Sequence, residues 1–108
     1  MNYSENVKII VYLLAENAKE VRVAMFNAGA GVIGDYVQCS WSTVGEGRFT
    51  PAKGSNPTIG SVGKAEVVKE ERTEILCPKN KLQEVITAMK KAHPYEEVAY
   101  DVYERLEV

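Results

Sequence analysis

The densest group of chemically active side chains in this 108-residue chain is the segment His93-Pro94-Tyr95-Glu96-Glu97. It holds the only histidine of the sequence, next to a phenol and two carboxylates. A histidine beside carboxylates can move a proton or bind a transition metal. His93 is therefore the candidate metal ligand of the chain, and a divalent metal ion is the candidate cofactor.

The competing interpretation of the same segment is a helix stop. His93 would then offset the dipole at a helix C-terminus, Pro94 would end the helix, and the two carboxylates would be solvated. One histidine with extended neighbours also cannot supply three converging ligands, so a metal site would need residues from further subunits. Both interpretations stay open from the sequence.

A second candidate wall for a binding cleft is the segment Cys39–Pro51, which runs into a stretch rich in glycine and proline, Val44–Gly63. An irregular stretch of this length is uncommon in a compact domain and is often functional, although a flexible hairpin tip would have the same composition. Within it, Gly47–Pro51 is compatible with a short strand or arm. The predicted ligand-binding residues are Cys39, Ser40, Trp41, Thr43, Gly45, Phe49, Pro51, His93, Tyr95, Glu96 and Glu97.

Other chemistries have weak support, and we assign no catalytic residue. Ser40 and Cys39 have no base near them in the sequence, which argues against a nucleophile. Backbone amides of the glycine-rich stretch could bind phosphate, but Lys53-Gly54-Ser55 does not complete a Walker pattern. The segment Gly29–Gly34 matches GxGxxG, yet it follows a predicted helix and leads into a strand, which is the wrong context for a dinucleotide site.

Four runs rich in β-branched and apolar residues predict the strands that must position these segments. Lys8–Leu14 is nearly continuous in apolar residues and indicates a central strand buried on both faces. Tyr36–Val44 alternates with period two, which is typical of a strand with one buried face. Charges interrupt the long run Ala65–Cys77, so we expect a bend or bulge there, or an exposed or intersubunit edge. Val98–Tyr103 is the last predicted strand.

Two amphipathic helices lie between these strands. Asn17 and Glu20 have capping-box spacing for the first, and glycines follow its end. Asn80 and Gln83 have the same spacing for the second, which Pro94 ends. The apolar stripes consist of Val21, Ala24, Met25 and Ala28 in the first helix and of Leu82, Val85, Ile86, Met89 and Ala92 in the second.

The element order βαββαβ predicts an α+β, ferredoxin-like fold in a single domain spanning residues 1–108. Right-handed crossovers place both helices on one face of a four-stranded antiparallel sheet. The other face is left uncovered. Trp41 and several tyrosines are available there, and a partner subunit is the simplest cover.

Composition excludes several partners. The formal net charge is −2 and no Lys/Arg cluster stands out, which argues against a nucleic-acid partner. No apolar run approaches a membrane span and the N-terminus resembles no signal peptide, so we expect a cytoplasmic protein without a membrane partner. Cys39 and Cys77 are far apart, and we expect two reduced thiols rather than a disulfide or redox pair.

Four ordered segments carry a resemblance to a known family. They are Phe26–Tyr36, Cys39–Pro51, Gly54–Gly60 and His93–Tyr103. Together they resemble the insert domain of the NGG-one-interacting-factor-like family, of the bacterial YqfO type, over roughly Lys8 to Tyr103. The resemblance implies a domain like PII signalling proteins and CutA, which are typically trimeric. The larger lobe that binds a pair of metal ions in full-length members has no counterpart in this sequence, so its chemistry does not carry over.

The resemblance and the residues together favour a stand-alone oligomeric module, expected to be a homotrimer and not an enzyme. It would bind a small molecule or metal ion at subunit interfaces and have a regulatory role. One alternative is an interaction module that docks on another chain. A hydrolase accessory domain, or an enzyme that uses His93 with Glu96 or Glu97, is less favoured.

Overall fold

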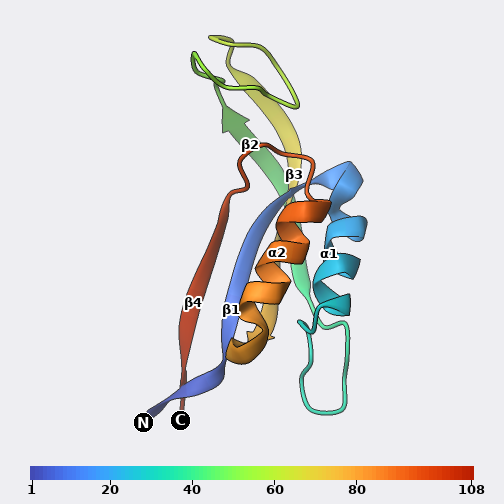
Figure 1. Cartoon of the computed structure of the whole chain (residues 1–108), viewed down its shortest axis with the longest axis vertical. Coiled ribbons are helices and arrows are strands. Elements are labelled where there is room, and N and C mark those ends of the chain that lie inside the picture. Colours follow the sequence, from blue (N-terminus) through green and yellow to red (C-terminus); the bar gives the residue numbers. More distant parts are fainter.

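A computed structural model describes all 108 residues and confirms the ferredoxin-like α+β fold. The sheet has the order β2-β3-β1-β4, and every neighbouring pair is antiparallel. Both helices cover one face, and the two termini lie side by side at one end (Figure 1). The elements are β1 (Asn2–Leu14), η1 (Ala15–Asn17), α1 (Ala18–Asn27), β2 (Trp41–Phe49), β3 (Glu66–Pro78), η2 (Lys79–Lys81), α2 (Leu82–Ala92) and β4 (Tyr100–Glu107).

The core lies between the two central strands and the helices. Ile9 in β1 pairs with Ile75 in β3, and both side chains are almost completely buried. Alternate residues of β1 share this face and pack against Val21 of α1 and Val85 of α2 in one apolar cluster. Lys8–Leu14 was thus correctly predicted as a central strand, and it extends further towards the N-terminus than predicted.

The predicted apolar stripes of both helices are confirmed, but the predicted capping boxes are not formed. Neither helix has a side-chain hydrogen bond at its N-cap. A short 3-10 turn precedes each helix instead, so that α2 begins at Leu82, just after the expected cap at Asn80. The tight turn takes over the entry to the helix that a capping side chain would otherwise fix.

The strand predicted over Tyr36–Val44 forms only from Trp41 onwards, and its predicted buried face was wrong. β2 begins at Trp41, and Val37 and Trp41 are exposed. The preceding residues form a loop because Gln38 has a φ of 57° and Cys39 N–H donates to Gly31 O at 2.8 Å. β2 is also the edge strand of the sheet, and much of it runs beyond the helices (Figure 1).

The charged strand contains no bulge, and of the expected alternatives the structure has the exposed half, because Glu66–Lys69 pairs with β2 alone. β3 keeps one unbroken register with β1 and another with β2. The register shift of the sheet lies between Tyr3 and Val7, where β1 pairs with β4. β4 itself begins at Tyr100 and continues to Glu107, so the predicted strand over Val98–Tyr103 is shifted towards the C-terminus.

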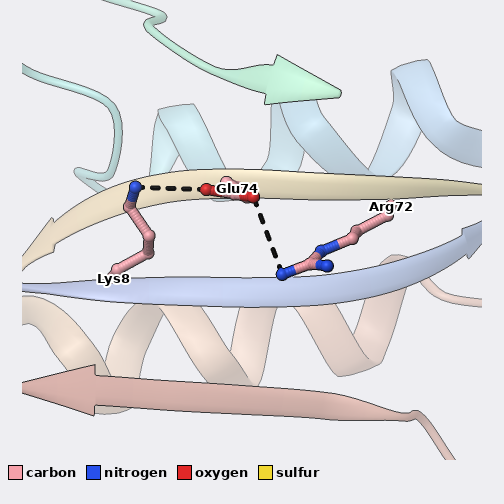
Figure 2. A network of polar contacts seen from close by, with 3 residues as sticks. All are labelled: Lys8, Arg72 and Glu74. Carbon is pink, nitrogen blue, oxygen red and sulfur yellow. Dashed lines mark hydrogen bonds and ion pairs between the residues drawn. The ribbon is translucent and has the colours of Figure 1, made fainter. Parts of the chain in front are cut away.

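The face of the sheet opposite the helices has no second layer. Lys8 and Arg72 both contact Glu74 on this face, with N···O distances of 3.1 and 3.7 Å (Figure 2). The strand register adds Trp41 beside Glu74 and Tyr103 beside Lys8, and both aromatic side chains are more than half exposed. We call this surface the open face. None of the helices is long and apolar enough to cross a membrane.

Candidate functional site

A cavity of about 380 Å³ lies where the β2–β3 hairpin meets the segment that joins α2 to β4. We call it the arm cavity, because β2 and β3 continue past the end of β1 as a two-stranded arm. It is bounded by the end of β2, the loop between β2 and β3, and the turn after α2. Its lining residues are Arg48, Phe49, Thr50, Pro51, Ala52, Ser55, Pro57, Thr58, Ile59, Glu70, Tyr95, Glu96, Glu97 and Ala99.

The register of the strands explains how the arm forms. β1 ends at Leu14, opposite Glu70, whereas β2 stays paired with β3 as far as Phe49 and Glu66. The loop that follows β2 is closed at its base, because Gly63 N–H donates to Pro51 O at 2.7 Å. Gly63 has a φ of +83°, a conformation that side chains of L-residues disfavour.

Two contacts fasten this loop to the turn after α2. The backbone N–H of Asn56 donates to both carboxylate oxygens of Glu96, at 3.0 and 3.3 Å. The hydroxyl of Thr58 donates to Pro94 O at 2.7 Å. Segments about 40 residues apart in the chain thereby become opposite walls of one cavity.

Tyr95 connects the turn to β3. Its hydroxyl donates to Glu70 Oε2 at 3.3 Å, and its ring lies 6.3 Å from that of Phe49, centroid to centroid. Burial, followed by the negative charge of Glu70 and the hydrogen bond that this carboxylate accepts, raises the pKa of Tyr95 to about 12. Tyr95 is therefore a neutral phenol that donates to a carboxylate.

His93 is buried behind this wall rather than exposed in it. Tyr95 N–H donates to Nδ1 at 3.1 Å, so Nδ1 carries no proton. Nε2 lies 3.0 Å from Tyr12 O and must donate to it. The two contacts are satisfied together only by the neutral Nε2–H tautomer, and they join the turn to β1. α2 ends at Ala92 with His93 as its C-cap, as the helix-stop interpretation expects, and the ring of His93 is buried there.

The arrangement around His93 gives little support for a metal site. Both ring nitrogens of His93 are engaged by backbone groups. No group of three or more His, Cys, Asp or Glu side chains is placed so that it could hold a metal ion. A complete coordination sphere of three or more such ligands would need residues from another molecule.

The structure brings together five of the predicted site residues, which are Phe49, Pro51, Tyr95, Glu96 and Glu97. Trp41 lies eight residues along β2 from Phe49, about 26 Å away at strand spacing, so it cannot reach the same ligand. Cys39 and Ser40 precede it in the loop after α1, while Thr43 and Gly45 lie between the two ends of β2 on the open face.

Sequence reasoning missed Glu70 and the loop residues around Asn56. Glu70 is one of several charges in β3, and only the strand register shows that it faces the cavity. The loop residues had one signal, the Asn56-Pro57-Thr58 turn in the glycine-rich stretch. Arg48 was also missed, but its guanidinium contacts Glu46 at 3.4 Å, on the other face of β2 from Phe49.

The loop that carries the GxGxxG pattern has a structural explanation. It follows α1 and leads into β2, as predicted. Gly31 is buried, and its N–H donates to Leu76 O at 2.7 Å. A side chain at Gly31 would meet the Phe26 ring at 2.8 Å and would need a φ of +82°. Glycine is therefore required for the loop to dock against β3.

No family model matches the chain, but individual proteins do. It is 51% identical over 96 residues to a protein of Bacillus subtilis named GTP cyclohydrolase 1 type 2 homolog, and 50% identical to one of that name from Mycobacterium tuberculosis. Each alignment covers 89% of this chain but only 26% and 25% of the relative. The chain thus spans about a quarter of the length of the curated relatives it matches.

Solved structures also include one longer protein, of which this chain matches a part, and shorter proteins that it matches over most of their length. The Bacillus cereus protein related to NIF3 superposes with a TM-score of 0.83 and 42% identity, over 99% of this chain and 27% of that one. CutA1 of Shewanella sp. SIB1 has a TM-score of 0.68 at 14% identity and covers 99% of this chain and 86% of its own. GlnK of B. subtilis has a TM-score of 0.61 at 13% identity, over 95% and 85%. The chain is therefore similar in sequence to one segment of longer, NIF3-related proteins, and it shares its ferredoxin-like fold with CutA and GlnK.

Proposed function

We propose that this chain is an oligomeric PII/CutA-like module that binds a small molecule in the arm cavity. The observation that carries the proposal is the cavity itself, whose volume lies within the range usual for ligand sites. Its walls combine apolar side chains such as Phe49 and Pro51 with a few fixed polar groups, among them Tyr95 and Glu70. Such walls hold a small ligand by burial and orient it by hydrogen bonds.

Self-association is the second part of the proposal. On the open face, Trp41 is 61% exposed and Tyr103 is 53% exposed. Exposed apolar surface of this kind often marks an interaction site. A second copy of the chain would cover these side chains, and the resemblance to PII and CutA favours a trimer. Phe49 lies on the same face of β2 as Trp41, so the arm cavity would lie beside such an interface.

We propose a binding role rather than a catalytic one. The only histidine has both ring nitrogens engaged by backbone groups, so it is not free to act as a base for a nearby nucleophile. The names of the longer relatives suggest an enzymatic activity. If this chain takes part in it, it does so together with the other three quarters of such a protein. The two free thiols agree with a reducing compartment, and we propose the cytoplasm.

The test is a thermal-shift screen against amines, carboxylates, nucleotides and divalent metal ions. A ligand that binds only the folded chain raises the melting temperature, and amide chemical shifts then locate it. We expect shifts at Phe49, Tyr95 and the loop around Asn56. Ligands that raise the melting temperature while shifting only residues outside the cavity would contradict the proposal. Light scattering after gel filtration tests the oligomer, and a monomer at all concentrations would contradict that part.

A second function, docking on another protein, is favoured by the loop after α1. This loop exposes a row of apolar side chains with exposed fractions between 43% and 76%: Val32, Ile33, Tyr36 and Val37. Exposed apolar groups of this kind are frequent at interaction sites. Affinity capture with the wild-type chain and an Ile33→Asp, Val37→Asp variant tests it. A partner captured equally by both would exclude this loop as the docking site.

A further inference from the structure

The arm cavity is lined by carboxylates that lack cationic partners. Glu70, Glu96 and Glu97 all line it, and none of them forms an ion pair within 4.0 Å. Other acidic residues of the same sheet are paired, such as Glu74 with Lys8 and Glu71 with Arg22. No ion pair therefore neutralises these three carboxylates, in contrast to the paired acidic residues of the neighbouring strand surface.

Arg48 is the one basic residue of the lining, and its ion pair is with a carboxylate outside the lining. That carboxylate is Glu46, on the opposite face of β2. The hydrogen bonds of His93 require its neutral tautomer, so the buried ring adds no positive charge. An anionic ligand would meet three lining carboxylates against one lining guanidinium, which is already paired with Glu46.

The three carboxylates differ in the contacts that they make. Both oxygens of Glu96 accept the Asn56 N–H and hold the loop in place. Glu70 accepts the Tyr95 hydroxyl through Oε2, and its other oxygen lies directly over the backbone of Gly47. A β-carbon at Gly47 would come within 1.8 Å of Glu70 Oε1, so only glycine lets the carboxylate occupy this position. Glu97 is exposed and adds negative potential at the rim.

Aromatic and apolar surface lies next to the fixed carboxylate. The rings of Phe49 and Tyr95 are tilted by 58° to each other, and Pro51, which is buried, lines the same cavity. Such rings favour the flat body of a ligand and also attract a cation to their faces. A charge-assisted hydrogen bond to Glu70 would fix the polar end of the same ligand.

From these contacts we infer that the arm cavity takes a small organic cation, in which an amine or amidine is carried on an aromatic or apolar body. The inference rests on the proposed function and specifies its ligand class. Glu70 binds the cationic group directly, and the negative charge of Glu97 attracts it from a greater distance. The aromatic or apolar body of the ligand packs against Phe49 and Tyr95. Phosphates and nucleotides are disfavoured at this site by the same charge.

Three probes of one size and different charge test the inference: benzylammonium, benzyl alcohol and benzoate. Each is titrated into the ¹⁵N-labelled full chain, and amide shifts of the cavity residues give the dissociation constant. We expect benzylammonium to bind most tightly, benzyl alcohol roughly tenfold more weakly, and benzoate least. Glu70→Gln should weaken benzylammonium binding roughly tenfold, and Glu97→Gln roughly twofold. Glu16→Gln, an exposed acidic position in η1, is the matched control and should change nothing.

The outcomes separate this inference from the proposed function. Equal binding of the three probes at the cavity would overturn the cation class and leave small-molecule binding standing. Benzylammonium binding that is insensitive to Glu70→Gln would also overturn the class. If Mg²⁺ displaces benzylammonium at equal or lower concentration, the site is inorganic and the inference fails. Shifts confined to residues outside the cavity for all probes would contradict both proposals.

Discussion

The two ends of β3 belong to one strand but to different environments. Towards its C-terminus, Thr73, Ile75 and Cys77 are at most 1% exposed and face the helices. Towards its N-terminus, Glu66–Lys69 pairs with β2 alone, and Val67 is 55% exposed. The hydrogen-bond register is unbroken throughout, so the difference comes from what packs against the strand. The C-terminal end of β3 therefore contributes most to stability, whereas its N-terminal end, which packs against no helix, forms part of the arm.

The largest expected effect comes from shortening one apolar side chain at each end. Ile75→Ala should lower the free energy of unfolding by about 3 kcal/mol, because a buried cavity replaces packed methyl groups. Val67→Ala should change it by less than about 0.5 kcal/mol, since that side chain is already solvated. Urea unfolding followed by circular dichroism measures both, and the exposed Trp41 makes fluorescence a less suitable probe. Similar costs at the two positions would mean that the arm is buried, as it would be in an oligomer.

Alkaline pH should destabilise the chain in two different pH ranges, one set by Cys77 in the buried end of β3 and one by Tyr95, which contacts Glu70 near the other end. Burial raises the pKa of the Cys77 thiol from 9.0 to about 11, against a lowering influence of the Lys81 ammonium. Tyr95, at the cavity, is raised from 10.0 to about 12. Each group is protonated more readily in the folded chain, so its stabilisation is complete below the unfolded pKa and lost as the pH rises through the folded pKa. The windows are about pH 9–11 for Cys77 and about pH 10–12 for Tyr95.

Melting temperatures from pH 8 to 11.5 test these windows as differences between variants and wild type. Cys77→Ala should lose stability at pH 8 but decline less steeply between pH 9 and 11. Tyr95→Phe should flatten only the part above pH 10, since the phenol no longer ionises. Curves of both variants that run parallel to the wild-type curve would show that neither group is shifted.

A pair of glycines on β2 tests the placement of Glu70 with little effect on the core. Gly47→Ala would push the Glu70 carboxylate away and break its hydrogen bond with Tyr95, whereas a β-carbon at Gly45 meets no atom within 4 Å. Alanine in a strand otherwise gains about 0.5 kcal/mol over glycine. We therefore expect Gly47→Ala to be less stable than Gly45→Ala by about 1 kcal/mol and to lose benzylammonium binding. Equal stability and equal binding in the two variants would show that Glu70 is not fixed by Gly47.

The buried half of the molecule was predictable from sequence, because its signals are local. The apolar run at Lys8–Leu14 and the two helical stripes reflect burial directly, and the element order then determines the fold. The strand assigned to Tyr36–Val44 was wrong before Trp41, because alternation alone does not provide a pairing partner. Gln38 takes a left-handed conformation and the loop docks through Gly31 instead.

The candidate site was predictable only in part, because its walls come from distant segments. Tyr95, Glu96 and Glu97 drew attention by residue type, and Phe49 and Pro51 by their place beside the glycine-rich stretch. Glu70 was not recognised, since its role depends on a β2–β3 register that its neighbours in sequence do not reveal. For His93 the sequence leaves a ligand and a helix stop both open, because it does not show that two backbone groups contact the ring nitrogens.

The smallest effect that we expect distinguishes two adjacent carboxylates at the arm. Glu96→Ala removes the acceptor of the Asn56 N–H, so this exposed loop should open more often, at a cost of about 0.5–1 kcal/mol in local stability. Hydrogen exchange at the Asn56 amide should accelerate roughly threefold, while the core amides of Ile9 and Ile75 keep their rates. Glu97→Ala is the control, because Glu97 holds no loop amide, and it should leave exchange unchanged. If both variants accelerate Asn56 exchange equally, the loop is held by the general charge of the turn, and the assignment of Glu96 to structure and Glu97 to the ligand is wrong.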